Sequence, residues 1–255
     1  MTSSESPLTT SRPHVNQRTT SPWTIERRAA FDLETTGRNS RSARIVTASI
    51  VVLEADGSVE SEHEWLADPG VEIPAEAAEV HGISTEKARA EGRPAREVVA
   101  EVAETLQSLF DRGVPVVAYN AAYDFTVMAA ECARHGLPQL TRFPVLDPYV
   151  INKQVERYRK GKRTLGALCE QYGVILTDAH SSAADALAAA QLLDAMATRF
   201  PELHKPAAHL HRSQIDWSAA QAADFQAYLR RTKPAAVVEG DWPVLAPHDA
   251  GQAGF

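Results

Sequence analysis

Residues 31–37 read FDLETTG, which places two carboxylates two residues apart at the end of an apolar run. Residues i and i+2 of a β-strand project to the same face, so Asp32 and Glu34 would direct their carboxylates toward one point. Oxygen ligands of this kind bind hard cations such as Mg²⁺ and Mn²⁺. An isolated D-x-E pair also occurs on exposed acidic strands, and taken alone the pair favours that simpler interpretation.

The order of elements around this segment predicts an α/β fold. A hairpin-like group of strands comes first, and helices connect the later strands, which implies a mixed five-stranded sheet flanked by helices. The expected strands are residues 28–33, 45–53, 59–66, 114–119 and 143–146. The expected helices are residues 96–112, 123–135, 165–172 and 182–199, with a further helix starting near residue 148.

The length of 255 residues suits one domain with extensions. Residues 1–26 begin with a Ser- and Thr-rich stretch and are expected to be a disordered tail. Residues 27–200 would form the α/β domain, and residues 201–255 a small C-terminal appendage with a helix over residues 218–231. No secretory signal or membrane-spanning run is seen, so a cytoplasmic protein with Cys132 and Cys169 as buried free thiols is expected.

The formal net charge of −7 does not by itself indicate a nucleic-acid-binding protein. Residues 153–163 nevertheless hold six lysines and arginines against the single acid Glu156. Such a cluster could contact phosphates, or it could be a solvated helix end and loop, which is what most charge runs are.

Two further acids fall at positions that suit the same site. Asp124 follows the strand that ends at Asn120 and lies in the first turn of a helix, where strand ends and helix starts form a crevice. The alternative is a favourable contact between an acid and a helix N-terminus. Asp185 stands in an Ala-rich helix start, five residues after His180. Five helical residues turn through about 500°, so His180 is expected on the preceding loop rather than on the same helix face.

Three segments resemble motifs of one enzyme family. FDLETTG at residues 31–37, NAAYDF at residues 120–125 and His180-x-x-x-x-Asp185 look like the three exonuclease motifs of the DEDDh, or DnaQ-like, family, which includes the proofreading epsilon subunit of bacterial DNA polymerase III. The resemblance covers roughly residues 28–199, and Val80-His81-Gly82-Ile83 also resembles a family segment. It implies an RNase H-like fold.

The resemblance also implies an activity, which is 3′-to-5′ exonuclease hydrolysis with two divalent cations, Mg²⁺ or Mn²⁺. Asp32, Glu34, Asp124 and Asp185 would be the acidic quartet that holds the metals, and His180 would be the general base. A histidine with an ordinary pKa near 6.5 can accept a proton from water near neutrality. Paired cations can generate hydroxide and stabilise the leaving 3′-oxygen.

Substrate contacts are expected from five further residues. Leu33 and Thr35 could contact the terminal nucleotide, and Tyr123 its sugar, although strand packing, turn formation and core packing are alternative roles for them. Lys162 and Arg163 could hold the strand's phosphates, because an acidic metal site needs basic neighbours to attract a polyanion. His81 is interpreted as structural and Asp147 as a helix cap.

Single-stranded or frayed 3′ ends, with DNA favoured, are the expected substrate, and a DNA polymerase is one candidate partner in proofreading or repair. An RNA-trimming exoribonuclease would share the same quartet. A non-catalytic replication-protein binding module on the same fold is a second alternative, which the intact quartet opposes.

Overall fold

A mixed sheet of six strands forms the centre of the computed structural model, which describes residues 21–141, 144–177 and 180–247. The strand order is β4-β3-β2-β1-β5-β6. The first three strands form an antiparallel meander, and β5 and β6 continue the sheet in parallel with β1. The strands are β1 (Arg28–Thr35), β2 (Ile45–Leu53), β3 (Val59–Asp68), β4 (Arg93–Pro94), β5 (Val116–Val117) and β6 (Val145–Leu146).

The expectation of five strands is wrong, because β4 adds a sixth at the edge. It pairs in parallel with the end of β3 through Ala67 with Arg93 and Asp68 with Pro94. A strand of two residues is too short to show the alternation by which strands are recognised in a sequence. The expected strand over residues 114–119 is reduced to β5, and of the strand expected over residues 143–146, Phe143 lies outside the described residues.

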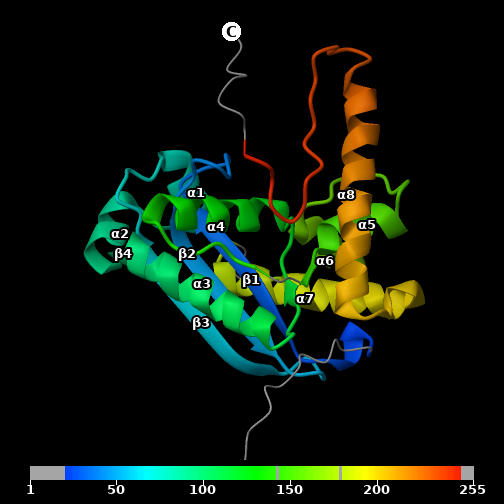
Figure 1. Ribbon diagram of the computed structural model, residues 1–255, viewed down its shortest axis with the longest axis horizontal. Coiled ribbons are helices and arrows are strands. Elements are labelled where there is room, and N and C mark those ends of the chain that lie inside the picture. Colours follow the sequence, from blue (N-terminus) through cyan, green and yellow to red (C-terminus); the bar gives the residue numbers. More distant parts are fainter. Residues whose placement is uncertain (1–20, 142–143, 178–179, 248–255) are drawn as a thin grey trace, which may run out of the picture.

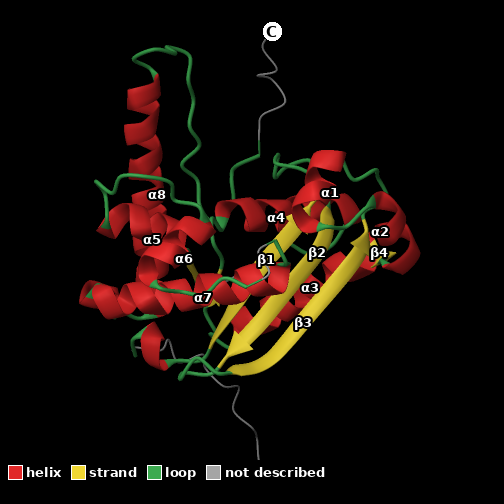
Figure 2. Ribbon diagram, turned by 180° about the vertical axis from the view of Figure 1, so that it is seen from behind, coloured by secondary structure: helices red, strands yellow, loops and turns green. Residues whose placement is uncertain are grey.

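Helices cover both faces of the sheet (Figure 1). One core contains the side chains between the sheet and α3 (Ala95–Asp111) and α4 (Ala122–His135). A second core lies on the other face, where α7 (Ser182–Arg199) packs with α5 (Pro148–Val155) and α6 (Leu165–Tyr172), as the reverse view shows (Figure 2). The short helices α1 (Ala75–His81) and α2 (Thr85–Glu91) contribute a third, smaller cluster beside β2.

Local capping explains where several of these helices begin and end. The side chains of Ser84, Asp147 and Thr164 accept hydrogen bonds from the backbone N–H groups at the starts of α2, α5 and α6. Gly136 and Gly173 adopt left-handed backbone conformations at the ends of α4 and α6. These caps confirm the helix boundaries that the sequence predicted for this part of the chain.

The C-terminal part of the chain is built into both cores. Helix α8 (Ala207–Leu229) begins before the expected residue 218, and Leu210 packs into the core beneath α7. The buried Gln214 accepts a hydrogen bond from the Asp147 N–H at 2.7 Å and donates one to the Val145 carbonyl at 3.1 Å. Beyond α8 the chain turns back and runs beside the helix (Figure 1), and its Trp242 is buried in the other core.

A short 3₁₀ helix, η1 (Trp23–Ile25), precedes β1. Trp23 is completely buried, and its indole N–H donates to the Leu203 carbonyl at 2.9 Å. Residues 1–20 lie outside the described part, so the expected tail is not tested there. Its expected boundary at residue 26 lies too far along the chain, because Trp23 belongs to the core.

Helix α7 is attached to the sheet at two separated points. Near its start, the Ser182 hydroxyl lies 2.7 Å from that of Ser49 and 3.2 Å from that of Thr47, both on β2. Further along, Asp194 forms an ion pair with Arg28, whose side chain is buried at the start of β1. The Ala-rich face between these points packs closely on β1.

Cys132 and Cys169 are buried free thiols, as predicted. Burial raises the pKa of each to about 11, which keeps both thiols protonated near neutrality. Among the described helices, none combines the length and the apolar character that crossing a bilayer requires.

Candidate active site

The acidic run lies at the C-terminal end of β1, between β2 and β5. Phe31 and Leu33 are buried in the core of α3 and α4, whereas Ala30 is buried in the core of α7. Because strand residues alternate between faces, Asp32 and Glu34 belong to the face that α7 covers. The predicted pairing of the two carboxylates on one strand face is therefore present.

The loop before α7 brings His180 to the same place. One ring nitrogen of His180 and one carboxylate oxygen each from Glu34 and Asp185 lie within 4.8 Å of one another. His180 is exposed and adopts a left-handed backbone conformation, with φ of +74°. Residues other than glycine rarely adopt this conformation, and such positions cluster at functional sites. His180 thus stands on the loop, as predicted, while Asp185 enters from the first turn of α7.

Asp124 enters from the first turn of α4, and its side chain is only 4 % exposed. The turn that precedes it contains Asn120 in a left-handed conformation, with φ of +59°. The pKa of Asp32 is raised far above its ordinary value, first by burial and then by the negative charges of Asp124, Glu34 and Asp185. Charge effects of this size act over short distances, so the four acidic side chains lie near one another.

The other carboxylates experience the same environment. Burial, followed by the charge of Asp185, raises the pKa of Glu34 to about 7. Burial also raises the pKa of Asp185, although His180 acts in the opposite direction. The Oδ1 atom of Asp185 is buried and has no hydrogen-bond partner within the described part of the chain. Buried carboxylates that repel one another, one with an unpaired oxygen, form a donor set that suits a divalent cation.

The predicted nucleotide contacts have structural partners of their own. Leu33 is 5 % and Thr35 8 % exposed, so both pack largely inside the protein. The hydroxyl groups of Thr35 and Tyr123 and the carbonyl oxygen of Gly37 form one hydrogen-bonded set. Tyr123 therefore ties α4 to the turn that follows the acidic run. The expected contacts of these three side chains with a nucleotide stay predictions.

The basic residues lie on the loop between α5 and α6. Lys162 is exposed. The Arg163 guanidinium is partly buried and donates to the Asn152 side chain at 2.9 Å and to the Glu156 carbonyl at 2.6 Å. Arg163 thus shapes the loop, and a phosphate contact by either residue stays a prediction.

Sequence reasoning missed a supporting network behind Asp124. Asp147 caps α5 as predicted, but its carboxylate also accepts from the backbone N–H groups of Asn120 and Ala121 at 2.9 and 3.0 Å. The indole N–H of Trp242 donates to the same carboxylate at 3.2 Å. This network fixes the turn that positions Asp124. In the sequence, the one local indication of this network is Trp242, a large apolar residue in a segment without periodicity.

Comparison with known proteins places this site in a family. The family model RNase_T, described as an exonuclease, matches residues 29–193, a stretch that contains all four acids and His180. The chain belongs to this exonuclease family. Membership confirms the resemblance to DnaQ-like exonucleases on which the motifs were interpreted.

Curated relatives include the PolC-type DNA polymerase III of Streptococcus thermophilus strain LMD-9, which is 32% identical over 165 residues. The PolC-type DNA polymerase III of Streptococcus pneumoniae strain TIGR4 is 30% identical over 176 residues. These alignments cover 64% and 68% of this chain but only 10% and 11% of the polymerases. The similarity is thus confined to about a tenth of each relative.

Solved structures share the fold. Escherichia coli exonuclease I in complex with a dT13 oligonucleotide superimposes with a TM-score of 0.58 at 20% identity, covering 70% of this chain and 42% of exonuclease I. Exonuclease I of Methylocaldum szegediense gives the same TM-score at 18% identity and the same coverage. These matches confirm the expected RNase H-like exonuclease fold.

Proposed function

We propose that the protein is a DEDDh-type exonuclease that removes nucleotides from the 3′ ends of nucleic acid, with DNA as the favoured substrate. The observation that carries this proposal is the convergence of Glu34, His180 and Asp185 within 4.8 Å, beside the buried Asp32 and Asp124. Five polar side chains that come from three elements and one loop have no structural reason to meet at such an electrostatic cost.

The quartet fits two divalent cations, and Asp32, Glu34, Asp124 and Asp185 would hold them. The unpaired Oδ1 of Asp185 supports this assignment, because a cation would satisfy it. Asp32, the most central acid of the motif, is the candidate to contact both. When bound, Mg²⁺ or Mn²⁺ would activate water and neutralise charge on the phosphodiester. A zinc-bound form of Escherichia coli exonuclease I in complex with single-stranded DNA shows that a neighbour of this fold binds a metal.

His180 would accept the proton of the attacking water. Its exposed position on the loop before α7 leaves its ring open to solvent, while Asp185 holds a carboxylate near it. A proton-accepting imidazole contributes about 10²–10⁴-fold to a rate. The same position could instead make His180 a metal ligand, and a separate measurement distinguishes the two roles.

The similarity to DNA polymerases and to exonuclease I favours DNA over RNA. The similarity covers only about a tenth of the polymerases. A polymerase partner and a role in replication or repair are therefore proposed here rather than taken from those relatives. An RNA-trimming activity is the competing substrate assignment.

A degradation assay tests the proposal. The full chain is incubated with 5′-labelled single-stranded DNA, duplex DNA with a mismatched 3′ end, and RNA, each with Mg²⁺, Mn²⁺ or chelator. We expect progressive shortening from the 3′ end, release of nucleoside monophosphates, and no reaction in chelator. Asp32→Ala should abolish shortening, whereas Glu104→Ala, on the exposed surface of α3, should not. Absence of shortening on all three substrates, or an active Asp32→Ala protein, would overturn the proposal.

The variant His180→Ala distinguishes a role of His180 as general base from a role as metal ligand. We expect a loss of rate of about 10²–10⁴-fold with Mn²⁺ affinity, measured by titration calorimetry, within about twofold of the original. A matching collapse of Mn²⁺ affinity would assign His180 to the metal instead.

A further inference from the structure

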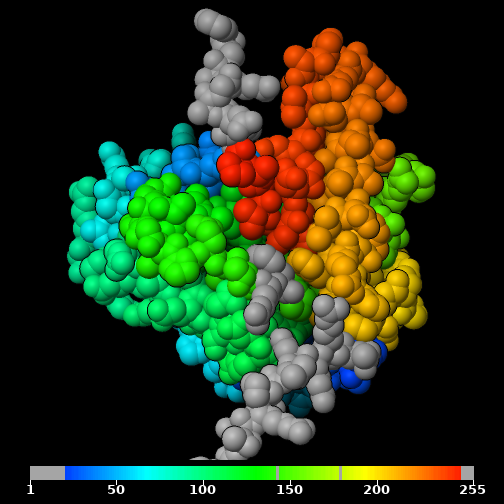
Figure 3. Space-filling model, viewed as in Figure 1, coloured from blue at the N-terminus to red at the C-terminus, as the bar shows by residue number. Residues whose placement is uncertain are grey.

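A groove runs from the turn before Asp124 to the C-terminal part of the chain. It has a volume of about 730 Å³, and its lining includes Asn120 and Tyr123 at the start of α4. Phe225 and Leu229 of α8 line it on the other side, together with Trp242 of the returning chain. The space-filling view shows the returning chain between α4 and α8 (Figure 3). Tyr123 precedes Asp124 and is hydrogen bonded to Thr35 and Gly37 at the end of the acidic run. This end of the groove therefore lies next to segments that carry the predicted acids.

Exposed aromatic rings gather around the far side of this groove. Phe225 and Tyr228 are 51% and 61% exposed, and their rings stack 6.4 Å apart with an angle of 12° between the planes. Tyr158, on the loop of residues 156–164, is 88% exposed. Within the described part of the chain, these are the exposed large aromatic side chains other than histidines. Exposed aromatic side chains that gather on two neighbouring segments indicate a surface that binds a ligand.

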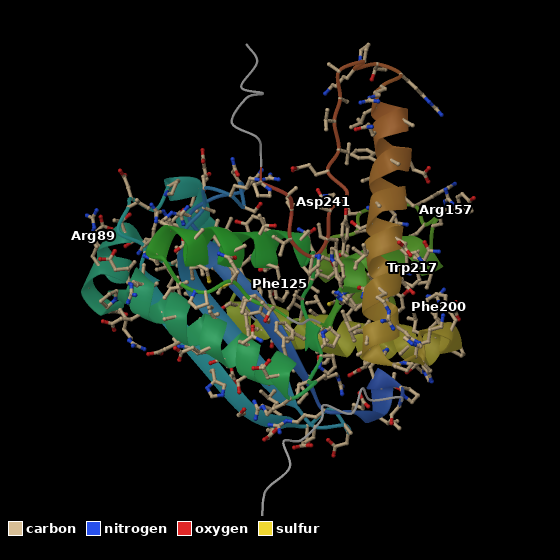
Figure 4. The ribbon with its side chains drawn as sticks, in the orientation of Figure 1. Arg89, Phe125, Arg157, Phe200, Trp217 and Asp241 are labelled. Carbon is tan, nitrogen blue, oxygen red and sulfur yellow. The ribbon has the colours of Figure 1, made fainter. Side chains whose placement is uncertain are left out.

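Cations accompany the rings. The guanidinium of Arg231 lies 5.8 Å from the centre of the Tyr228 ring, and that of Arg157 lies 6.0 Å from the centre of Tyr158. Arg157 also joins the loop to α8 through an ion pair of 2.6 Å with Asp224. Figure 4 shows Arg157 beside α8, across the molecule from Arg89. The loop and the end of α8 thus form one basic and aromatic surface, although the whole chain carries a net charge of −7.

Two of the three acids that line the groove, Asp147 and Glu239, have partners of their own. Asp147 is buried and accepts hydrogen bonds from three backbone N–H groups and Trp242. Glu239 forms an ion pair with Arg41. Asp241 is exposed. On the opposite wall, the ammonium group of Lys153 lies 4.9 Å from the centre of the Tyr149 ring.

We propose that the end of α8, with residues 230–233 that follow it, and the loop of residues 156–164 form a binding track for the single strand upstream of its 3′ end. Stacking platforms combined with cations are the means by which proteins bind single-stranded nucleic acid. This inference rests on the proposed exonuclease function. The groove connects this surface to the segments that carry the predicted acids. The aromatic rings would stack on bases, and the cations would attract the phosphates. The track predicts a preference for strands long enough to reach α8.

The test compares short and long strands on the full chain. Fluorescein-labelled oligo-dT of about 4 and about 20 nucleotides is used, spanning the site sizes typical of single-strand-binding proteins. Binding is measured by anisotropy in chelator, and cleavage is measured with Mg²⁺. The variants are Phe225→Ala with Tyr228→Ala, and Arg231→Glu with Lys233→Glu. The controls are Arg89→Glu on α2 and Ile175→Ala, an exposed apolar residue elsewhere.

We expect each double variant to bind the long strand about tenfold more weakly and to lose the preference in kcat/KM for the long over the short strand. The charge variant should also have a shallower dependence of affinity on salt. The controls should match the unaltered protein. Unchanged affinity for the long strand in both double variants would overturn the track and leave the surface to a protein partner. If the unaltered protein binds the long strand but cleaves nothing, the proposed function fails while the anisotropy result still decides the track.

Discussion

Single carboxyl groups determine how the site responds to pH. The pKa of Glu34 is raised from 4.5 to about 7 by burial and by Asp185. Between these values the folded protein holds a proton that the unfolded chain has released. The stability that Glu34 contributes is therefore present at low pH and is lost as pH rises through about 7. Divalent cations compete with this proton, so they should stabilise the protein most in the alkaline range.

Melting temperatures should show this dependence. In chelator, we expect the metal-free protein to melt at a higher temperature at about pH 5.5 than at about pH 8, and Mn²⁺ to restore stability mainly at the higher pH. Glu34→Gln should reduce the difference in chelator, with the raised pKa values of Asp32, Asp124 and Asp185 keeping part of it. Glu104→Gln should retain the full difference. A melting temperature in chelator that rises with pH would contradict the assignment of Glu34.

Asp147 supports the site from behind through hydrogen bonds. Asp147→Asn keeps the size of the side chain but turns an amide NH₂ toward N–H donors. Either Ala121 and Trp242 or Asn120 and Tyr149 then lose their acceptor. We expect a loss of about 1–3 kcal/mol in the free energy of unfolding, measured in urea. Asp241→Asn, next to Trp242 but exposed, should be neutral within about 0.5 kcal/mol.

At the scale of elements, the junction between α2 and β4 depends on the absence of one side chain. A Cβ atom on Gly92 would lie 2.3 Å from the Ala88 carbonyl oxygen and 2.6 Å from backbone atoms of Ala67 and Asp68. Backbone atoms of two elements cannot yield as a flexible side chain can. Gly92 therefore permits the two-residue pairing of β4 with β3.

Gly92→Ala should destabilise the protein by about 1–3 kcal/mol in urea unfolding. Gly166→Ala, within α6, is the matched comparison, because its Cβ would meet only Leu176 at 3.9 Å. That change should stabilise the protein by about 0.5–1 kcal/mol. A neutral Gly92→Ala would show that β4 can separate from β3 without cost.

Elements with local chemical signatures could be predicted from the sequence. The D-x-E spacing in β1 and the caps at Ser84, Asp147 and Thr164 act between neighbours in the chain, so a short window contains them. β4 could not be predicted, because two residues have no period. The start of α8 was missed because its buried Gln214 looks like a surface residue until the backbones of Val145 and Asp147 pair with it.

The same limit applies to the candidate site. Its five residues belong to motifs, each short enough to recognise. The contact between Asp147 and Trp242 joins residues that are 95 positions apart. No local pattern encodes a partner at that distance, so the network that fixes the turn before Asp124 became visible only in the folded chain.

At the scale of the whole molecule, the part after α7 completes both cores. It contributes Leu203, Ala207 and Leu210 to one core and Trp242 to the other. A chain of residues 21–200 would expose those apolar contacts and leave the Trp23 indole without its acceptor on Leu203. We expect it to aggregate or to lose its cooperative melting transition by circular dichroism, whereas residues 21–247 should melt as the full chain does. A cooperative transition of residues 21–200 within a few degrees of the full chain would show that the domain ends at α7.

The two attachments of α7 have a consequence for the metal site. Alanine-rich surfaces interlock weakly, so such a helix could slide along a sheet by one turn, or about 5.4 Å. That displacement exceeds the 4.8 Å within which the atoms of Glu34, His180 and Asp185 meet. The hydroxyl cluster around Ser182 and the ion pair of Arg28 with Asp194 fix the position of α7 along the sheet at two separate points. Substitution of Arg28, at the opposite end of β1 from Glu34, should therefore change the distance between the carboxylates of Glu34 and Asp185.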